Sequence, residues 1–372
     1  MKSSPLAAIR RRVLAGSWAS MLLVGPGLAP VSPAGAQETP AAQDSARFQR
    51  TAADTAKNGG VGLVVDDYGI SFGDSRRING LRFNFRDSRL ERVNGLNFTV
   101  WTPKDDATGV VNGVAIGIAA TGAKVINGLG IGFGVQGTDR LTGVMLTVLG
   151  AGSGSALQGV TIGGLGVGTG GRAVGINIGG LGVGAGESMS GLNVGGLGVG
   201  SGGPVSGMTI GGLGAGSGGN LSGLTIGGLG AGAAADMQGV TIGGLAAGNG
   251  GHMKGLTIGG IAAGAGASID GVAIGGIGAG SPHTRGVLLS GIAAGGEDVD
   301  GLVAAGAYVR IEKGELRGVG IAAFNHIQGV QKGLTIGIFN YASVLHGLQI
   351  GLLNYAKKNG RFPILPIVNW GP

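Results

Sequence analysis

Apolar and polar positions recur along most of this chain with a period of about sixteen residues. The clearest copies run from Gly223 to Gly271 and read GLTIGGLGAGAAADMQ, GVTIGGLAAGNGGHMK and GLTIGGIAAGAGASID. The first glycine of the copy recurs eighteen times from Gly80 to Gly347, and its spacing is a strict sixteen between Gly159 and Gly271. A fixed period of this length is typical of repeat architectures, in which one unit cannot bury its apolar side chains alone.

The alternation inside one copy predicts two short strands joined by a corner. Counted from the glycine as position zero, positions one and three are aliphatic, position two is Thr, Asn or Ala, and positions six and eight are Leu, Ile, Val or Ala. Residues one and three share a strand face, so we expect them inside and position two outside. The change of parity between positions three and six predicts a corner at the Gly-Gly of positions four and five. Another apolar position, two residues before the glycine, completes the predicted interior.

This pattern predicts an all-β fold, a single-chain β-solenoid of about 18 coils with 15–16-residue repeats. Coils stacked about 4.8 Å apart would form a rod of roughly 85 Å. The alternative is an outer-membrane up-and-down β-barrel, because eighteen is even and ten residues of each copy suffice to cross a bilayer. Every copy carries the same loop, and no Phe, Tyr or Trp occurs between Gly134 and Ala307, so the pattern favours the solenoid.

Composition narrows the classes of protein further. The 372 residues include 88 glycines and no cysteine, which excludes a disulfide scaffold. The glycines do not fall at every third position, so the chain is not collagen. Because 43% of the residues are hydrophobic and periodic, we expect a folded chain.

The ends of the chain predict export. Residues 1–36 contain a basic run at Arg10–Arg12, an apolar stretch and the site Ala34-Gly35-Ala36, as in a secretory signal peptide. Its removal lowers the formal charge from +7 to +3, so nucleic acid is not an expected partner. The predicted division is a signal peptide at 1–36, a flexible linker at 37–59, an N-terminal cap at 60–79, the Gly-rich repeat solenoid at 80–359 and a C-terminal cap at 360–372.

Two columns of polar residues are the candidate site residues. Position two repeats as Thr209, Thr225, Thr241 and Thr257, which we expect to form a surface ladder able to bind a periodic surface such as ice or a glycan lattice. Near the C-terminus asparagine recurs at position seven. We expect these residues to form an amide ladder or, equally, three solvent-facing turns: Asn325, Asn340 and Asn354.

Other chemical signals are sparse. The four histidines are scattered without metal-ligand spacing, and no catalytic triad is indicated by their positions. The carboxylates of Glu297, Asp298 and Asp300 offer oxygen ligands for Ca²⁺, although a solvated loop is the favoured interpretation. No catalytic residue, cofactor or metal site is therefore predicted.

The phrases GLTIGIFNYA, HGLQIGLLNYAKKNG and FPILPIVNW, with INGLRFNF and VNGLNF upstream, carry a resemblance. Over residues 78–101 and 318–370 the chain resembles bacterial surface-repeat proteins built on Gly-Leu-x-Ile-Gly-Leu-x-Asn units, whereas its middle has Gly in place of Asn. The resemblance implies an exported, surface-associated protein without an assigned enzymatic activity.

The sequence thus predicts a non-enzymatic exported repeat protein, a structural or adhesive element of the bacterial cell envelope or surface. The expected location is the cell surface, the outer membrane or the periplasm. Its expected partners are envelope or extracellular surface components and other copies of itself. A barrel in the outer membrane is the main alternative, and a binder of ice or glycan is a minor one.

Overall fold

Twenty-nine strands make up nearly all of the regular structure in the part of the chain that the computed structural model describes, residues 60–104, 107–358 and 363–372. These residues belong to one compact unit, Phe48–Pro372. The predicted signal peptide and linker, 1–36 and 37–59, lie outside the described residues. The strands that precede the regular coils are β1 (Gly60–Val65), β2 (Tyr68–Gly73), β3 (Arg77–Asn84), β4 (Arg92–Thr99) and β5 (Val110–Ser153).

Each regular coil contributes one longer and one shorter strand. The longer strands are β6 (Ala156–Gly163), β8 (Arg172–Gly179), β10 (Ser188–Gly195), β12 (Val205–Gly211), β14 (Leu221–Gly227), β16 (Met237–Gly243), β18 (His252–Gly259), β20 (Ser268–Gly275), β22 (His283–Ser290), β24 (Asp298–Ala305) and β26 (Glu315–Ile321). The shorter strands are β7 (Gly166–Thr169), β9 (Gly182–Ala185), β11 (Gly198–Ser201), β13 (Gly214–Ser217), β15 (Gly230–Ala233), β17 (Ala246–Asn249), β19 (Ala262–Ala265), β21 (Gly278–Gly280), β23 (Ala293–Gly296) and β25 (Tyr308–Ile311). The last strands are β27 (Phe324–Ile336), β28 (Phe339–Ala356) and β29 (Ile364–Gly371).

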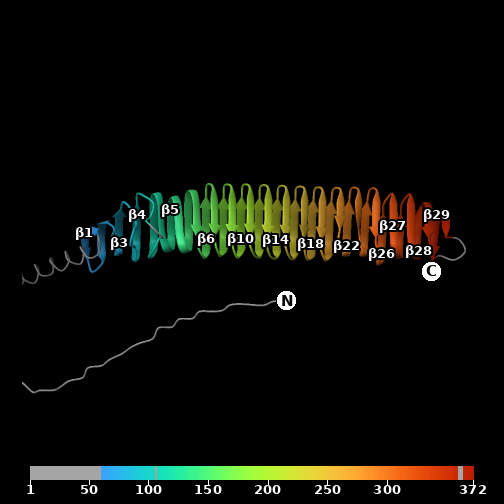
Figure 1. The fold of residues 1–372 in the computed structure, drawn as a ribbon, viewed down its shortest axis with the longest axis horizontal. Coiled ribbons are helices and arrows are strands. Elements are labelled where there is room, and N and C mark those ends of the chain that lie inside the picture. Colours follow the sequence, from blue (N-terminus) through green and yellow to red (C-terminus); the bar gives the residue numbers. More distant parts are fainter. Residues whose placement is uncertain (1–59, 105–106, 359–362) are drawn as a thin grey trace, which may run out of the picture. The chain divides into compact units, whose positions relative to one another are not determined.

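The coils stack in parallel and in register. β14 pairs with β12 before it and with β16 after it, so Thr225 lies beside Thr209 and Thr241. β15 pairs in the same way with β13 and β17. Figure 1 shows these coils following one another along a single β-solenoid. The predicted solenoid is confirmed, with about 17 turns between the eighteen recurring glycines, and the alternative of an up-and-down barrel is wrong because neighbouring coils run parallel.

The course of one coil explains its period. β14 ends at Gly227, the bend at Gly228 and Leu229 turns the chain, and β15 follows. A second bend leads from Ala233 to Met237, where the next coil begins. Along the described residues there is no helix of sufficient length and apolarity to cross a membrane.

Three glycines of each regular coil are required by close backbone contacts, two of them with the preceding coil and one within the coil. Gly223 has φ +103°, and a Cβ added there would lie 2.1 Å from the carbonyl oxygen of Gly207 in the preceding coil. At the bend, a Cβ on Gly227 would lie 1.9 Å from the carbonyl oxygen of Gly230, and one on Gly228 would lie 1.8 Å from that of Gly212. In the coils from Gly159 to Gly271, positions zero, four and five are therefore all glycine, because each contact is with backbone that cannot move aside.

The two ends of the solenoid differ from the middle. At the N-terminal end β1 and β2 form an antiparallel hairpin, and β2 pairs in parallel with β3. At the C-terminal end β29 pairs antiparallel with β28 and so covers the edge of the last coil. An open sheet edge invites pairing with other chains, so this final strand protects the end of the solenoid.

Substitution of glycine by alanine tests the requirement at position zero. We expect Gly223→Ala to lower the free energy of unfolding by roughly 1–3 kcal/mol, because the residue is held at positive φ against backbone. Gly216→Ala is the matched control, since a Cβ there meets nothing within 4 Å, and its expected effect is within about 0.5 kcal/mol. Urea unfolding followed by circular dichroism measures both, and equal effects would contradict the steric argument.

Candidate functional site

The threonine column lies inside the solenoid, not on its surface. Thr209, Thr225, Thr241 and Thr257 are 1%, 1%, 3% and 2% exposed. The predicted surface ladder is therefore wrong. The threonine column gives no support to the binding of ice or glycan. The physical reason is strand parity: in β14 the inward residues are Leu221, Thr225 and Gly227, all at even positions, while the residues between them face out.

Position two suits the interior because the space is narrow. A typical coil fills its cross-section with one long side chain two residues before the glycine, Thr at position two, Gly at position four and Ala at position eight. In one coil these residues are Met237, Thr241, Gly243 and Ala247, all buried. Threonine is β-branched and favours strands, and its small volume fits beside the methionine.

The aliphatic residues at positions one, three and six face outward, which corrects their predicted place in the interior. Position six lies at the bend, where Leu229 is 50% exposed, while Leu224 and Ile226 at positions one and three are partly exposed. We call these three columns the apolar face. Its most exposed column is Leu149, Leu165, Leu181, Leu197, Leu213, Leu229, Leu245, Ile261, Ile277 and Ile292, each between 44% and 51% exposed.

The asparagines near the C-terminus form a buried amide ladder. Asn325 Nδ2 donates to Asn340 Oδ1 at 2.8 Å, and Asn340 Nδ2 donates to Asn354 Oδ1 at 2.7 Å. All three side chains are fully buried, so they are not solvent-facing turns. Asn325 aligns with Val309 of the preceding coil, so the ladder continues the inward column of position eight.

A buried ionic cluster at the N-terminal end was missed by the sequence analysis. Arg82 is 0% exposed at position two, and its guanidinium donates to the carboxylates of Asp74 and Asp87 and to Asn97 Oδ1. Asp87 Oδ2 also accepts from Thr99 Oγ1 at 2.8 Å. A buried charge is stabilised only when paired and hydrogen-bonded, so this cluster is a structural element of the first coils. The one signal in the sequence is a charged residue in a column that otherwise holds uncharged residues.

An aromatic ladder covers the outer side of the short strands near the C-terminus. The rings of Tyr308, Phe324 and Phe339 follow one another with centroid distances of 5.3 and 4.9 Å. In the adjacent column His326 stacks on Phe324 at 5.4 Å and meets the ring of Tyr341 at 5.0 Å. Rings at these distances stabilise neighbouring strands by cross-strand contact.

His326 is the titratable group most affected by this ladder. Its Nδ1 lies 2.8 Å from the hydroxyl of Tyr308. Burial lowers the pKa of His326 below its ordinary value of 6.5, and the positive charge of Arg310 lowers it further. The folded protein therefore favours the neutral imidazole.

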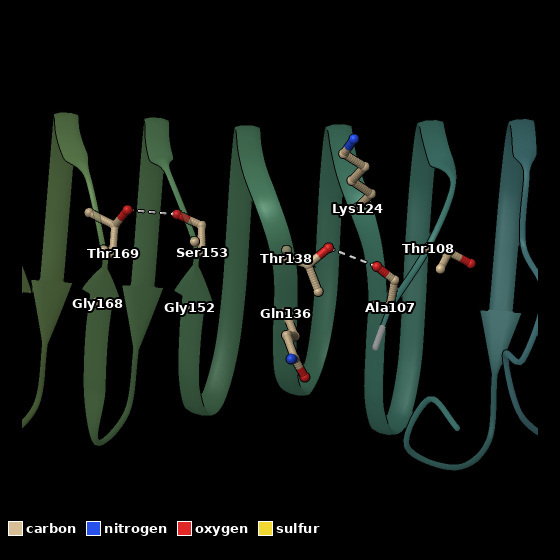
Figure 2. Close-up of a pocket in the computed structure, with 12 residues that line it drawn as sticks. Ala107, Thr108, Lys124, Gln136, Thr138, Gly152, Ser153, Gly168 and Thr169 are labelled. Atoms are coloured by element: carbon tan, nitrogen blue, oxygen red, sulfur yellow. Dashed lines mark hydrogen bonds between the residues drawn. The ribbon is translucent and has the colours of Figure 1, made fainter. Parts of the chain in front are cut away.

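A hollow of about 750 Å³, lined by hydroxyl groups and by apolar atoms, lies on the outside of the coils that follow the N-terminal segment. Figure 2 shows hydroxyl groups from successive coils along it, with Ser153 Oγ donating to Thr169 Oγ1 at 2.9 Å and Thr138 Oγ1 donating to the carbonyl of Ala107 at 2.8 Å. Lys124 supplies an exposed positive charge at the margin. Because these hydroxyl groups bond to each other and to backbone, they mainly tie neighbouring coils together.

Charged side chains gather on the long strands of the C-terminal half. Asp298 lies 3.1 Å from His283 Nδ1, and its Oδ1 accepts from the backbone amide of Glu315. Glu315 contacts Lys332 and Arg317, whose hydrogen bonds, in that order, lower the pKa of its carboxyl. The described residues contain no group of three metal-ligating side chains, and Asp298, one of the carboxylates considered for Ca²⁺ beside the favoured solvated loop, is engaged with protein groups.

Comparisons with known proteins do not assign this chain to a family. Models of protein families, curated proteins and solved structures all return no match to the chain.

The amide ladder is tested by Asn340→Leu. We expect a loss of about 2–4 kcal/mol in the free energy of unfolding, because the substitution leaves Asn354 Oδ1 without its buried donor and removes the hydrogen bond from Asn340 Nδ2 to the carbonyl of Ile350. The matched control is Thr209→Val, because the buried Thr209 Oγ1 has no hydrogen-bond partner among the described residues and Val303 already stands in the same column. We expect this change to cost less than about 1 kcal/mol in the same urea titration, since no hydrogen bond is lost, and a larger cost for the control would contradict the assignment.

The pKa of His326 predicts a pH-dependent stability. Since the folded state lowers this pKa, the unfolded chain binds the proton more readily, and the histidine's contribution to stability is lost as the pH falls through about 6.5. His326→Tyr, which extends the tyrosines of the same column, should remove that part of the pH dependence. Urea unfolding at pH 8 and pH 5 compares the two proteins, and an unchanged difference between the two pH values would contradict the prediction.

Proposed function

We propose that this chain is a non-enzymatic exported repeat protein that acts as a structural or adhesive element of the bacterial cell envelope. The observation that carries the proposal is the apolar face, which repeats in coil after coil on the outside of the solenoid. Its column at position six spans ten successive coils from Leu149 to Ile292. Exposed apolar surface of this extent is typical of an interaction surface.

The chemistry of the outward positions supports a binding role over a catalytic one. Across the regular coils the outward groups are aliphatic at positions one, three and six, and mostly glycine at positions seven and nine. Such groups contact a partner by close packing, and they supply no acid, base or nucleophile for a reaction. The amides of the ladder bond to one another and to backbone carbonyls, and Arg82 is buried against the carboxylates of Asp74 and Asp87, so these polar groups are engaged within the solenoid.

The N-terminal sequence and the resemblance to surface-repeat proteins support the location. A basic segment, an apolar stretch and the Ala34-Gly35-Ala36 site are the features of a secretory signal peptide. The envelope would then receive a mature chain that begins at Gln37. The cell surface is the proposed site of action, with envelope or extracellular components as partners.

Export is tested in the bacterium that encodes the protein. We expect mass spectrometry to find a mature N-terminus at Gln37, and a membrane-impermeant amine reagent applied to intact cells to label the protein. Ala36→Asp is the control, because a charged residue at the cleavage site should leave the precursor uncut. A mature protein found only in the soluble periplasmic fraction and never labelled from outside would refute the proposed surface role.

A further inference from the structure

We propose that the apolar face is an interface between two copies of this chain, which pack outer sheet against outer sheet. The inference rests on the proposed function as an assembly element and names the partner. It starts from the column at position six. From Leu165 to Ile277, the backbone amide of each residue in this column donates to the carbonyl of the equivalent residue in the preceding coil, at 2.6–2.8 Å. The leucines and isoleucines therefore form one unbroken ridge along the bend.

The size of the face matches that of a stable dimer. Ten coils at about 4.8 Å extend over roughly 45 Å, and positions one to six at about 3.3 Å per residue give a width of roughly 15 Å. The footprint is then roughly 700 Å² per copy, close to the ~800 Å² per partner of a standard interface. It also exceeds the ~300–600 Å² of the largest apolar patch on a typical monomer.

The face continues at its N-terminal end beyond the first of these ten coils. There Ile118, Ile131 and Phe133 of the two preceding coils join Leu146 and Val148 of the first coil in lining an apolar hollow of about 500 Å³. Their side chains are 37–57% exposed. A hollow bordered by aliphatic side chains accepts a side chain of the same kind, so the additional area is complementary to the ridge of another copy.

A second copy fits this face better than a lipid surface does. A partner solenoid carries the same aliphatic columns at the same coil spacing, so a two-fold axis places ridges between ridges along the whole face. Membrane-surface elements instead combine apolar side chains with Trp or Tyr and with basic residues. Between Gly134 and Ala307 the chain has no aromatic residue, and from position one to position six of the ten coils it has no ionisable one.

The charges beside the face also suit a protein partner. The column that precedes the glycine runs Lys254, Asp270, Arg285, Asp300 and Arg317, with each residue in register with the next. Because the signs alternate, this margin has little net charge and does not repel a second copy that lies across it. A lipid surface of anionic composition would favour a margin of one sign.

The test is the oligomeric state of the mature chain, residues 37–372. We expect sedimentation velocity to show a dimer at micromolar concentration. The triple variant Leu213→Glu, Leu229→Glu and Leu245→Glu should weaken it by at least roughly 100-fold, because like charges would face one another across the interface. The three leucines are 47–50% exposed, so the fold should be retained and circular dichroism checks it.

The matched control places the same charges on the short strands, away from the apolar face. Gly184→Glu, Gly200→Glu and Gly216→Glu lie at position nine, where an added Cβ meets no atom of the described residues within 4 Å, and this variant should remain dimeric. A second measurement uses Leu197→Cys, a residue of the same column that the triple variant leaves unchanged, and it is the sole cysteine of that variant because the natural chain has none. A nitroxide on this cysteine should report a distance to the label of the other copy, and the distance should disappear in the triple variant.

Three outcomes would overturn the inference: a monomer at about 100 μM, a dimer unaffected by the triple variant, or binding of the monomer to phosphatidylglycerol vesicles through the same leucines. The labelling of intact cells tests the proposed function and does not depend on the oligomeric state. A monomer displayed on the cell surface would refute the dimer and leave the proposed function standing. A dimer retained in the periplasm would support the dimer while the proposed function fails.

Discussion

The fold depends on how closely the backbone of one coil approaches the backbone of the next at position zero. In all eighteen coils this residue is a glycine at positive φ, and a Cβ there would lie 2.1–2.3 Å from the carbonyl oxygen of the glycine one coil earlier. The contact is between backbone atoms, so no change of rotamer can relieve it. Each coil must therefore place a glycine above the preceding glycine, and this requirement holds the repeat to one length over the regular region.

That length determines what the interior holds. With glycine at position four of the coils from Gly159 to Gly271, the inward positions that remain are two residues before the glycine, two after it and eight after it. In these coils only the first holds a long side chain, as at Leu221 and Met237, and the others hold Thr, Asn, Val or Ala. A narrow interior of this kind buries little apolar surface per coil, and hydrogen bonds between parallel coils supply the continuity of the stack. The larger aliphatic side chains are consequently left outside, where Leu229 and its equivalents form the apolar face.

The sequence could predict the period, the parallel solenoid and the bend after the Gly-Gly pair, because each follows from spacing. It could not decide which face of the strand points inward. Positions one and three alternate with position two in either case, and hydrophobicity favoured Leu224 and Ile226 over Thr225 for the interior. The structure reverses that choice, since the inward residues from Leu221 onward all have even positions. The available signal was that the inward positions are all even: two before the glycine, and two, four and eight after it. The general preference for burying large aliphatic side chains concealed this signal. The same reversal explains why Arg82 went unnoticed, since its column was thought to face solvent.

The ends of the solenoid show that the fold itself does not require the uniform outer side chains of the middle coils. The columns at positions seven and nine accept Tyr308, Arg310 and His326 near the C-terminus, so the fold tolerates large side chains there. In the regular coils these columns hold glycine or alanine, and at Gly184 and Gly200 nothing lies within 4 Å of an added Cβ. Aromatic stacking, the amide ladder and the ionic cluster all lie in the coils near the two ends of the solenoid. The central coils consequently present one chemically distinct outer surface, the apolar face, and any partner that recognises them must do so by its length and spacing more than by charge.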